Sequence, residues 1–220
     1  MSYKSRLLYI TITACGLAAV TTSLHAPALL AARLVAVNDT LSTSTPSLAA
    51  NHDIRFATAS TVPASGKIVF TPEAGAFTIP AGLDYTDIDI AINTVDVPVA
   101  ATPGTGSGSA LGASIVTGTS GSITITLNDT DSLNDGDSFF ILIGTNAVVG
   151  SAGDQQITNP SSVGSYTETI TTKNASNSII DTSTIQVALV QPVGVDANAP
   201  TNSVETPTIS PNGGSFTTST

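Results

Sequence analysis

Four aspartates crowd one short connection of the chain, "NDTDSLNDGDS" between Asn128 and Ser138. They are Asp129, Asp131, Asp135 and Asp137. Ca²⁺ prefers carboxylate oxygens, so these side chains are the candidate metal ligands of the sequence. Their spacing departs from the EF-hand rule, since Leu133 stands where a ligand belongs and no glutamate closes the loop. Asp135-Gly136 is also a good turn dipeptide, so a solvated turn without metal stays the alternative.

Nucleophilic catalysis would need a base beside a nucleophile. His52 is the one histidine beyond the N-terminal segment, and Asp53 follows it at the start of an alternating stretch. No G-x-S-x-G motif supplies a nucleophile, so we expect His52 to be an exposed histidine on an edge.

Other catalytic and nucleotide-binding patterns are equally unsupported. The glycine-rich stretch Thr102–Gly112 has no lysine and matches no phosphate-binding motif. Nothing marks two carboxylates as facing across a cleft, as glycoside hydrolysis would need. The sequence therefore predicts a protein that is not an enzyme, with Ca²⁺ as its one candidate cofactor.

The charge balance excludes one class of partner. The 220 residues carry a net charge of −10, and all 16 acidic residues lie at or beyond Asp39. Phosphate binding needs clustered lysine and arginine, so we expect no nucleic-acid partner. The single cysteine, Cys15, lies in the N-terminal segment. The rest of the chain must therefore be stabilised by its core and its backbone hydrogen bonds.

Residues 1–36 have the pattern of a signal peptide or a membrane anchor. Lys4 and Arg6 precede a stretch from Leu7 to Ala32 without Asp, Glu, Lys or Arg. A basic start followed by an apolar run is typical of an export signal, and cleavage after Ala26 fits best. Other cleavage sites stay open, near Ser23, Ala32 or Ala36.

Two alternatives to cleavage by a signal peptidase also stay open. Cys15 in "ITAC" resembles the lipidated cysteine of a bacterial lipobox, although only a short apolar run precedes it. An uncleaved helix is the other alternative, because the uncharged stretch could reach the ~20 residues that span a bilayer. Each version predicts that the chain from Val37 onward lies outside the cytoplasm.

The chain beyond this segment alternates apolar and polar residues with the period of two that half-buried strands require. In "TDIDIAINT" the isoleucines point inward, and Asp87 and Asp89 are expected on the solvated face. "SFFILIG" is continuously apolar, which predicts a central strand covered on both sides. Eight segments are predicted strands: "HDIRFATA", "GKIVFTP", "TDIDIAINT", "ASIVTG", "SITITLN", "SFFILIG", "SYTETITT" and "STIQVALVQP".

This pattern predicts an all-β, antiparallel β-sandwich that spans residues 38–191. No amphipathic helix interrupts the strands, which disfavours a parallel βαβ sheet. Asn38–Ala50 is a lead-in segment or an edge strand, and Thr102–Gly112 is a flexible loop. Residues 192–206 are the expected linker, and residues 207–220 either start a second β module or form a disordered tail.

Three motifs stand out within the predicted sandwich: Gly66–Ile68 ("GKI"), Ile143–Ala147 ("IGTNA") and Ile157–Tyr166 ("ITNPSSVGSY"). Together they resemble a type of secreted bacterial surface protein with an Ig-like β-sandwich. The resemblance covers most of Ser42–Val190. It implies an antiparallel Ig-like sandwich of about eight strands and a location at the cell surface, and it implies no catalytic residue and no substrate.

The closing stretch carries a second resemblance. Seven of its residues fit a "P-x-I-S-P-x-G-G-x-F" pattern: Pro207, Ile209, Ser210, Pro211, Gly213, Gly214 and Phe216. This pattern is similar to the opening of the chitobiase/β-hexosaminidase C-terminal type of Ig-like repeat, an accessory module of multidomain secreted proteins. The resemblance implies the start of a second, truncated β module.

The sequence as a whole predicts an exported, non-enzymatic structural or adhesive module of a bacterial cell-surface or extracellular protein. Its expected partners are the cell envelope, other surface proteins or glycans, with membrane anchoring through residues 1–36 as an option. A carbohydrate-binding module is one alternative, although only Tyr85 and Tyr166 remain as tyrosine platforms. A filament subunit is the other, in which Asn38–Ala50 adds to the exposed sheet edge of a neighbour.

Overall fold

A computed structural model describes residues 31–150, 152–191, 208–209 and 216–217. The predicted export segment up to residue 30, with Cys15 and Ala26, lies outside the described residues, and so does the predicted linker 192–206. In the part of the chain that the structure describes, no helix is long and apolar enough to cross a membrane.

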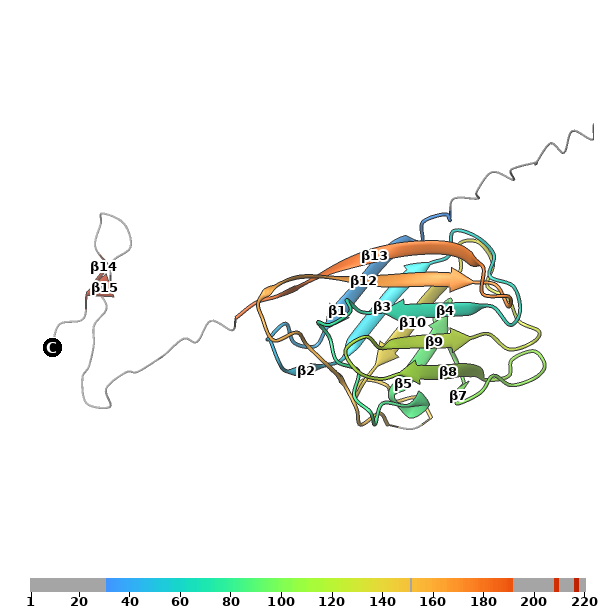
Figure 1. Ribbon diagram of the computed structural model, residues 1–220, viewed down its shortest axis with the longest axis horizontal. Helices are drawn as coiled ribbons and strands as arrows, with labels where there is room; N and C mark the ends of the chain where they lie inside the picture. Colours follow the sequence, from blue (N-terminus) through green and yellow to red (C-terminus); the bar gives the residue numbers. More distant parts are fainter. Residues whose placement is uncertain (1–30, 151, 192–207, 210–215, 218–220) are drawn as a thin grey trace, which may run out of the picture. The chain divides into compact units, whose positions relative to one another are not determined.

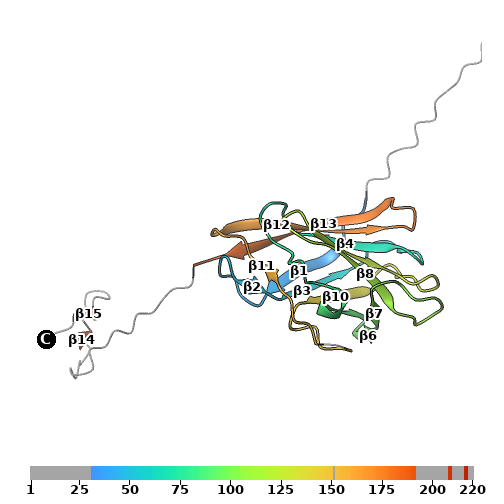
Figure 2. The ribbon, with the colours of Figure 1, turned by 60° about the horizontal axis from the view of Figure 1, so that its bottom comes forward.

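Two β-sheets stack face to face around one hydrophobic core (Figures 1 and 2). The five-stranded sheet has the order β1 (Val35–Leu41), β3 (His52–Ala57), β10 (Ser138–Ile143), β5 (Ile88–Ile92) and β6 (Val95–Val97). The six-stranded sheet has the order β13 (Ile179–Leu189), β12 (Gly164–Lys173), β4 (Lys67–Thr71), β9 (Ser122–Thr126), β8 (Leu111–Val116) and β7 (Val99–Ala100). Of these neighbours, only β7 and β8 run parallel.

The all-β, antiparallel sandwich predicted from the sequence is confirmed, and each of the eight predicted segments contains a strand. The further strands of the sandwich region are β1 and four segments of two or three residues. Of these short strands, β2 (Ala49–Ala50) pairs with β11 (Ile157–Thr158). A single turn of 3₁₀ helix, η1 (Tyr85–Asp87), leads into β5. Asn38 belongs to β1, an edge strand of the five-stranded sheet.

The core is built from one row of side chains on each strand, as the period-two pattern requires. Phe56 of β3 and Phe139 of β10 stack with their ring centroids 5.4 Å apart. The opposing sheet contributes Ile68, Phe70, Ile123, Ile125 and Ile170, all buried. Burying a side chain of this size contributes about 1.5–3 kcal/mol, so the interlayer core is the main source of stability.

The prediction that "SFFILIG" is covered on both sides is wrong. β10 is a central strand, but it alternates between buried and half-buried residues along its whole length. Phe139, Ile141 and Ile143 face the core, whereas Phe140 and Leu142 lie on the outer face of the sheet. A two-layer sandwich covers only one face of each sheet, so this apolar run leaves apolar side chains on the outside.

The alternation predicts that Asp87 and Asp89 lie on a solvated face, and this prediction is also wrong. Both are buried, because the segment that follows β10 folds over β5. Asp89 Oδ2 accepts hydrogen bonds from the backbone N–H groups of Val148 and Val149, at 2.5 and 2.8 Å. Asp87 Oδ1 accepts hydrogen bonds from two further backbone N–H groups of the same segment, at 2.7 and 2.8 Å. These two carboxylates therefore hold the loop in place.

The packing of the sandwich begins upstream of the expected boundary at residue 38. Leu34 is 5% exposed and belongs to the core cluster. Ala32 forms an isolated bridge with Asp181 of β13, and its carbonyl accepts a hydrogen bond from the N–H of Thr182 at 2.9 Å. The residues just before β1 thus tie one side of the five-stranded sheet to β13.

The closing stretch contains one small pairing. β14 (Thr208–Ile209) and β15 (Phe216–Thr217) are antiparallel, with Ile209 opposite Phe216. The turn between them lies outside the described residues. That this pair opens a second β module stays a prediction.

Leu34 gives a test of where the folded domain begins. We expect Leu34→Ala to lower the free energy of unfolding by about 2–5 kcal/mol, because it removes a buried side chain from the core. Val35→Ala is the matched control, since Val35 is 56% exposed, and it should cost no more than about 0.5 kcal/mol. Urea denaturation measures both, and equal effects would show that Leu34 does not pack in the core.

Candidate functional site

The acidic stretch is engaged with the glycine-rich loop. Asp129 Oδ1 accepts a hydrogen bond from the N–H of Gly106 at 2.7 Å. Asp131 accepts hydrogen bonds from the hydroxyl of Ser107 and the N–H of Gly108, both at 2.7 Å. The pKa of Asp129 is lowered chiefly by the Gly106 hydrogen bond, and that of Asp131 chiefly by the side chain of Asn128. These contacts hold the loop that the sequence predicts to be flexible.

The other two aspartates of the stretch lie in different surroundings. Asp137 accepts hydrogen bonds from the side-chain amide of Asn93 at 2.8 Å and from the N–H of Asn134 at 2.7 Å. Asp135 is exposed. The four predicted ligands are not among the groups of acidic and histidine side chains that converge within 4.8 Å in the described residues. The Ca²⁺ site stays a prediction.

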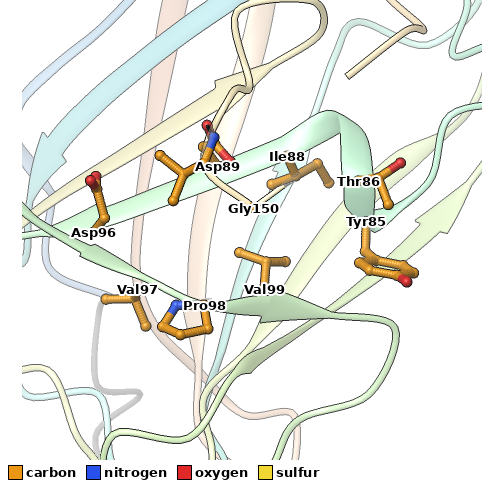
Figure 3. Close-up of a pocket in the computed structure, with 10 residues that line it drawn as sticks. Tyr85, Thr86, Ile88, Asp89, Asp96, Val97, Pro98, Val99 and Gly150 are labelled. Carbon is orange, nitrogen blue, oxygen red and sulfur yellow. Dashed lines mark hydrogen bonds between the residues drawn. The ribbon is translucent and has the colours of Figure 1, made fainter. Parts of the chain in front are cut away.

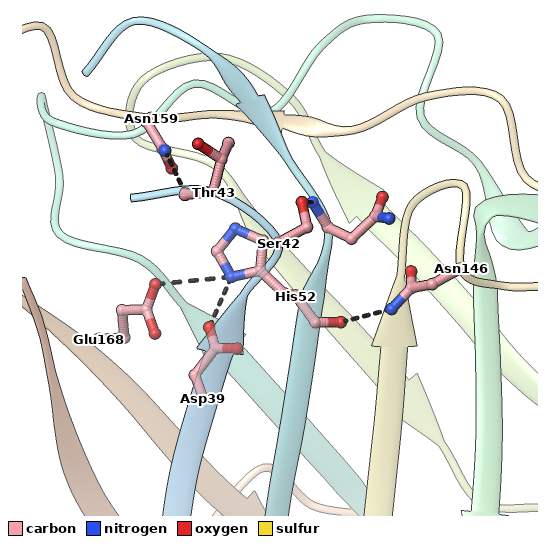
Figure 4. A network of polar contacts seen from close by, with 8 residues as sticks. Asp39, Ser42, Thr43, His52, Asn146, Asn159 and Glu168 are labelled. Carbon is pink, nitrogen blue, oxygen red and sulfur yellow. Dashed lines mark hydrogen bonds and ion pairs between the residues drawn. The ribbon is translucent and has the colours of Figure 1, made fainter. Parts of the chain in front are cut away.

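The group that does converge is Asp39, His52 and Glu168, from β1, β3 and β12 (Figure 4). The prediction of an exposed edge histidine is wrong, because all three side chains are completely buried. His52 Nδ1 lies 2.5 Å from Asp39 Oδ2 and 3.7 Å from Glu168 Oε1. The His52 ring also makes edge contacts with Phe70 and Phe77, at centroid distances of 5.8 and 6.0 Å. The cluster is thus a polar island within the interlayer core.

The electrostatics of this island are dominated by the two neighbouring carboxylates. Burial, and after it the neighbouring charge of Asp39, together raise the pKa of Glu168 to about 10. Glu168 is therefore protonated at neutral pH when no cation is bound to the cluster. Both of its oxygens, Asp39 Oδ1 and His52 Nε2 are buried without a protein hydrogen-bond donor or acceptor that matches them.

The positions of these polar residues in the alternating strands already indicate that they are buried, although they belong to no catalytic motif. His52 is in phase with Ile54 and Phe56 in "HDIRFATA", and Glu168 is in phase with Ile170 in "SYTETITT". The same alternation that buries the apolar residues must bury these two polar ones. Asp39 carries the same signal, because it is in phase with Val37 and Leu41 of β1, which pack against the core.

A second feature is a pair of hollows on the five-stranded sheet. The face hollow, of about 250 Å³, lies on the outer side of the sheet. Its apolar lining is the buried Ile90 together with Ala91, Phe140, Leu142, Val148 and Val149, and we call the last five residues the outer apolar face. The side hollow, of about 270 Å³, lies between η1, β5 and the Val97–Val99 segment (Figure 3). The two hollows share Asp89, Asp96 and Val149.

The rim of the face hollow holds one fixed cation. Arg55 donates two hydrogen bonds to Asp53, at 2.8 and 2.6 Å, and its guanidinium lies 5.3 Å from the centroid of the Phe140 ring. The hydrogen bonds and the charge of Asp53 raise the pKa of Arg55. Val148 and Val149 are 67% and 47% exposed at the opposite part of the lining. The outer apolar face is therefore open to solvent and edged by charges.

No protein-family model matches the chain, and no curated protein matches it. Comparison with solved structures gives distant likenesses. The chain is similar to BslA, a bacterial hydrophobin, with 14% identity and a TM-score of 0.39 over 70% of this chain and 98% of that one. It is similar to the collagen-binding domain of a Staphylococcus aureus adhesin, with 8% identity and a TM-score of 0.35 over 72% of this chain and 99% of that one.

A third likeness is to the pilus backbone protein RrgB of Streptococcus pneumoniae, with 9% identity and a TM-score of 0.31 over 64% of this chain and 30% of that one. These likenesses concern the arrangement of the strands. The chain is an all-β sandwich that resembles Ig-like and adhesin domains, and it has a distant structural resemblance to bacterial surface proteins.

The raised pKa of Glu168 predicts that the stability of the protein depends on pH. A chelator is included so that no metal ion is bound to the cluster. The pKa of Glu168 is about 10 in the folded protein and 4.5 ordinarily, so the folded state binds more protons than the unfolded state between these values. The free energy of unfolding should therefore fall as the pH rises from 4.5 toward 10. This group contributes no more than about 1.4 kcal/mol per pH unit.

Urea denaturation at about pH 5, 7 and 9 measures this slope. Glu168→Gln has no titrating side chain at this position, so its slope should be less steep than that of the wild-type chain. Identical slopes in the two proteins would contradict the raised pKa of Glu168.

Proposed function

We propose that this chain is an exported structural or adhesive module of a bacterial cell-surface or extracellular protein, without enzymatic activity of its own. The outer apolar face is the observation that carries the proposal. A sandwich needs apolar side chains only between its sheets, yet Phe140 and Leu142 lie on the outside. Exposed apolar surface of this kind commonly marks a contact with another molecule.

The partner that fits this face is a segment of another surface protein with apolar and basic side chains. The hollow accepts apolar groups, because aliphatic and aromatic side chains make up most of its lining. Asp53, Asp89 and Asp96 border it with one cation, Arg55, which pairs with Asp53, and the whole chain carries a net charge of −10. Complementary charge favours a basic partner and disfavours an acidic one.

A peptide array that varies apolar content and net charge independently tests this proposal. We expect binding to peptides that combine apolar and basic residues. Replacing Val148 and Val149 together by serine should weaken that binding about tenfold, since two apolar contacts are lost and the backbone donors to Asp89 remain. Val163→Ser is the matched control, because Val163 is 52% exposed and lines neither hollow. Equal binding by the double variant and the wild-type chain would overturn the proposal.

Carbohydrate binding at the side hollow is a second candidate. Tyr85 is 38% exposed and lines one end of this hollow, and the exposed Asp96 lines the other end (Figure 3). Sugars bind to proteins through aromatic faces and hydrogen-bonding side chains of this kind. Tyr166 is a poorer platform, because its hydroxyl donates to the Ser162 carbonyl at 2.8 Å and its ring contacts Phe77.

A glycan array decides whether the side hollow takes sugars. If it does, the wild-type chain should bind at least one glycan class, and Tyr85→Ala should reduce that binding about tenfold or more through loss of the stacking surface. Val163→Ser is again the control and should bind as the wild type does. Absence of any glycan signal, or binding that Tyr85→Ala leaves unchanged, would remove this candidate.

The filament alternative faces a specific cost. It requires part of Asn38–Ala50 to pair with a neighbouring molecule, whereas β1 pairs here with β3 of its own sheet, from Val35 opposite Ala57 to Leu41 opposite His52. Exchange of this strand into the neighbour would break that pairing and uncover Asp39, whereas addition along the other side of this edge strand would keep the pairing. No feature of the described residues favours the filament subunit, whereas the outer apolar face favours an adhesive module and Tyr85 in the side hollow favours a carbohydrate-binding module.

A further inference from the structure

We propose that Asp39, His52 and Glu168 bind one divalent transition-metal ion, with Zn²⁺ the best match, between the two sheets. This site is separate from the outer apolar face and does not depend on the function proposed above.

The first observation is the convergence of the donor atoms. The imidazole and the two carboxylates offer ligand atoms that all lie within 4.8 Å of one another (Figure 4). They come from three strands and from both sheets. A set of one nitrogen and two oxygen donors suits Zn²⁺, which binds histidine and carboxylate side chains in sites with three protein ligands and one water molecule as the fourth ligand.

The second observation is that three carboxylate oxygens of the cluster have no hydrogen-bond partner in the protein. Glu168 is completely buried, and neither of its carboxylate oxygens has a hydrogen-bond donor in the protein. Asp39 Oδ1 is in the same position. Buried polar atoms in proteins are almost always bonded, so each of these oxygens requires an explanation. A metal ion at the centre of the cluster supplies the partner that the protein does not.

Charge balance supports a divalent ion. Two carboxylates side by side in an apolar interior cost several kcal/mol if both are ionised without compensation. With His52 neutral, Asp39 and Glu168 together carry two negative charges, which one divalent cation neutralises. Binding of the ion displaces the proton of the Glu168 carboxyl group, which leaves to solvent, and His52 binds the ion through an unprotonated ring nitrogen.

The distances require a small adjustment only. Donors of a tetrahedral Zn²⁺ site are about 3.3 Å apart when the bonds are about 2.0–2.1 Å. Here His52 Nδ1 lies 2.5 Å from Asp39 Oδ2 and 3.7 Å from Glu168 Oε1. One separation has to lengthen and the other to shorten, each by less than about 1 Å. Rotation of the Asp39 carboxylate, whose Oδ1 has no partner, allows this.

Such an ion would link the edge strand β1 to the opposite sheet. A domain without a thiol has no disulfide to make this connection, and a structural metal ion contributes its binding energy to folding. The expected role of the ion is therefore to fix β1 in place.

The test is the metal content of the untagged chain after refolding. The chain is unfolded with a chelator, refolded with Zn²⁺ and desalted, and the zinc is counted by mass spectrometry. We expect about one ion per chain, and at least about tenfold less for Glu168→Gln and His52→Gln. Asp129→Asn is the matched control, because it removes one exposed carboxylate and should retain the ion. Circular dichroism checks that each variant is folded.

Two further measurements on the wild-type chain do not depend on variants that fold. Refolding with Co²⁺ should give the intense visible absorption of a tetrahedral site, and Zn²⁺ should abolish it. Infrared spectra of the zinc-loaded chain should lack a protonated carboxyl band from Glu168, because a ligand must be deprotonated. A wild-type chain that retains less than about 0.1 zinc ion, or Glu168→Gln that retains as much as the wild type, would overturn the proposal.

Discussion

The stability of this molecule depends on the contact between the inner faces of its two sheets. The sandwich has no cysteine, so no disulfide joins one sheet to the other. Ile54, Phe56 and Phe139 from one sheet must therefore hold against Ile68 and Phe70 from the other. Leu34, just before β1, extends this contact along the side where β1 and β13 meet. The two other main features are a polar cluster inside this core and an apolar face on the outer side of the five-stranded sheet.

The polar cluster inside the core consists of Asp39, His52 and Glu168. Polar groups are placed in an apolar interior at a cost, which falls only when they share protons, form ion pairs or bind an ion. The structure brings the three groups from three strands to one point, so the cluster lies at the junction of the two sheets. If a metal ion occupies this point, the cluster becomes a cross-link in a domain that has no disulfide.

The outer side of the five-stranded sheet follows from the same layering. Because a two-layer sandwich covers one face of each sheet, Phe140 and Leu142 lie outside, partly covered by the loop that Asp87 and Asp89 hold through backbone hydrogen bonds. Interior packing and outer binding surface are thus two faces of the same strand, β10. An adhesive role uses the outer face and leaves the core unchanged.

The strands could be predicted from the sequence, because the alternation of apolar and polar residues is visible in each short segment of the chain. Ile88, Ile90 and the repeats in "SITITLN" sufficed for the all-β sandwich. Only the tertiary structure shows the surroundings of each polar side chain, since the residue type of an aspartate is the same whether it faces water or a backbone amide. Asp87 and Asp89 became loop anchors because a segment more than fifty residues away folds over them. His52 faces inward with Ile54 and Phe56, but only the fold brings Asp39 of β1 and Glu168 of β12 to it, because contacts between residues so distant in the chain exist only in the folded protein.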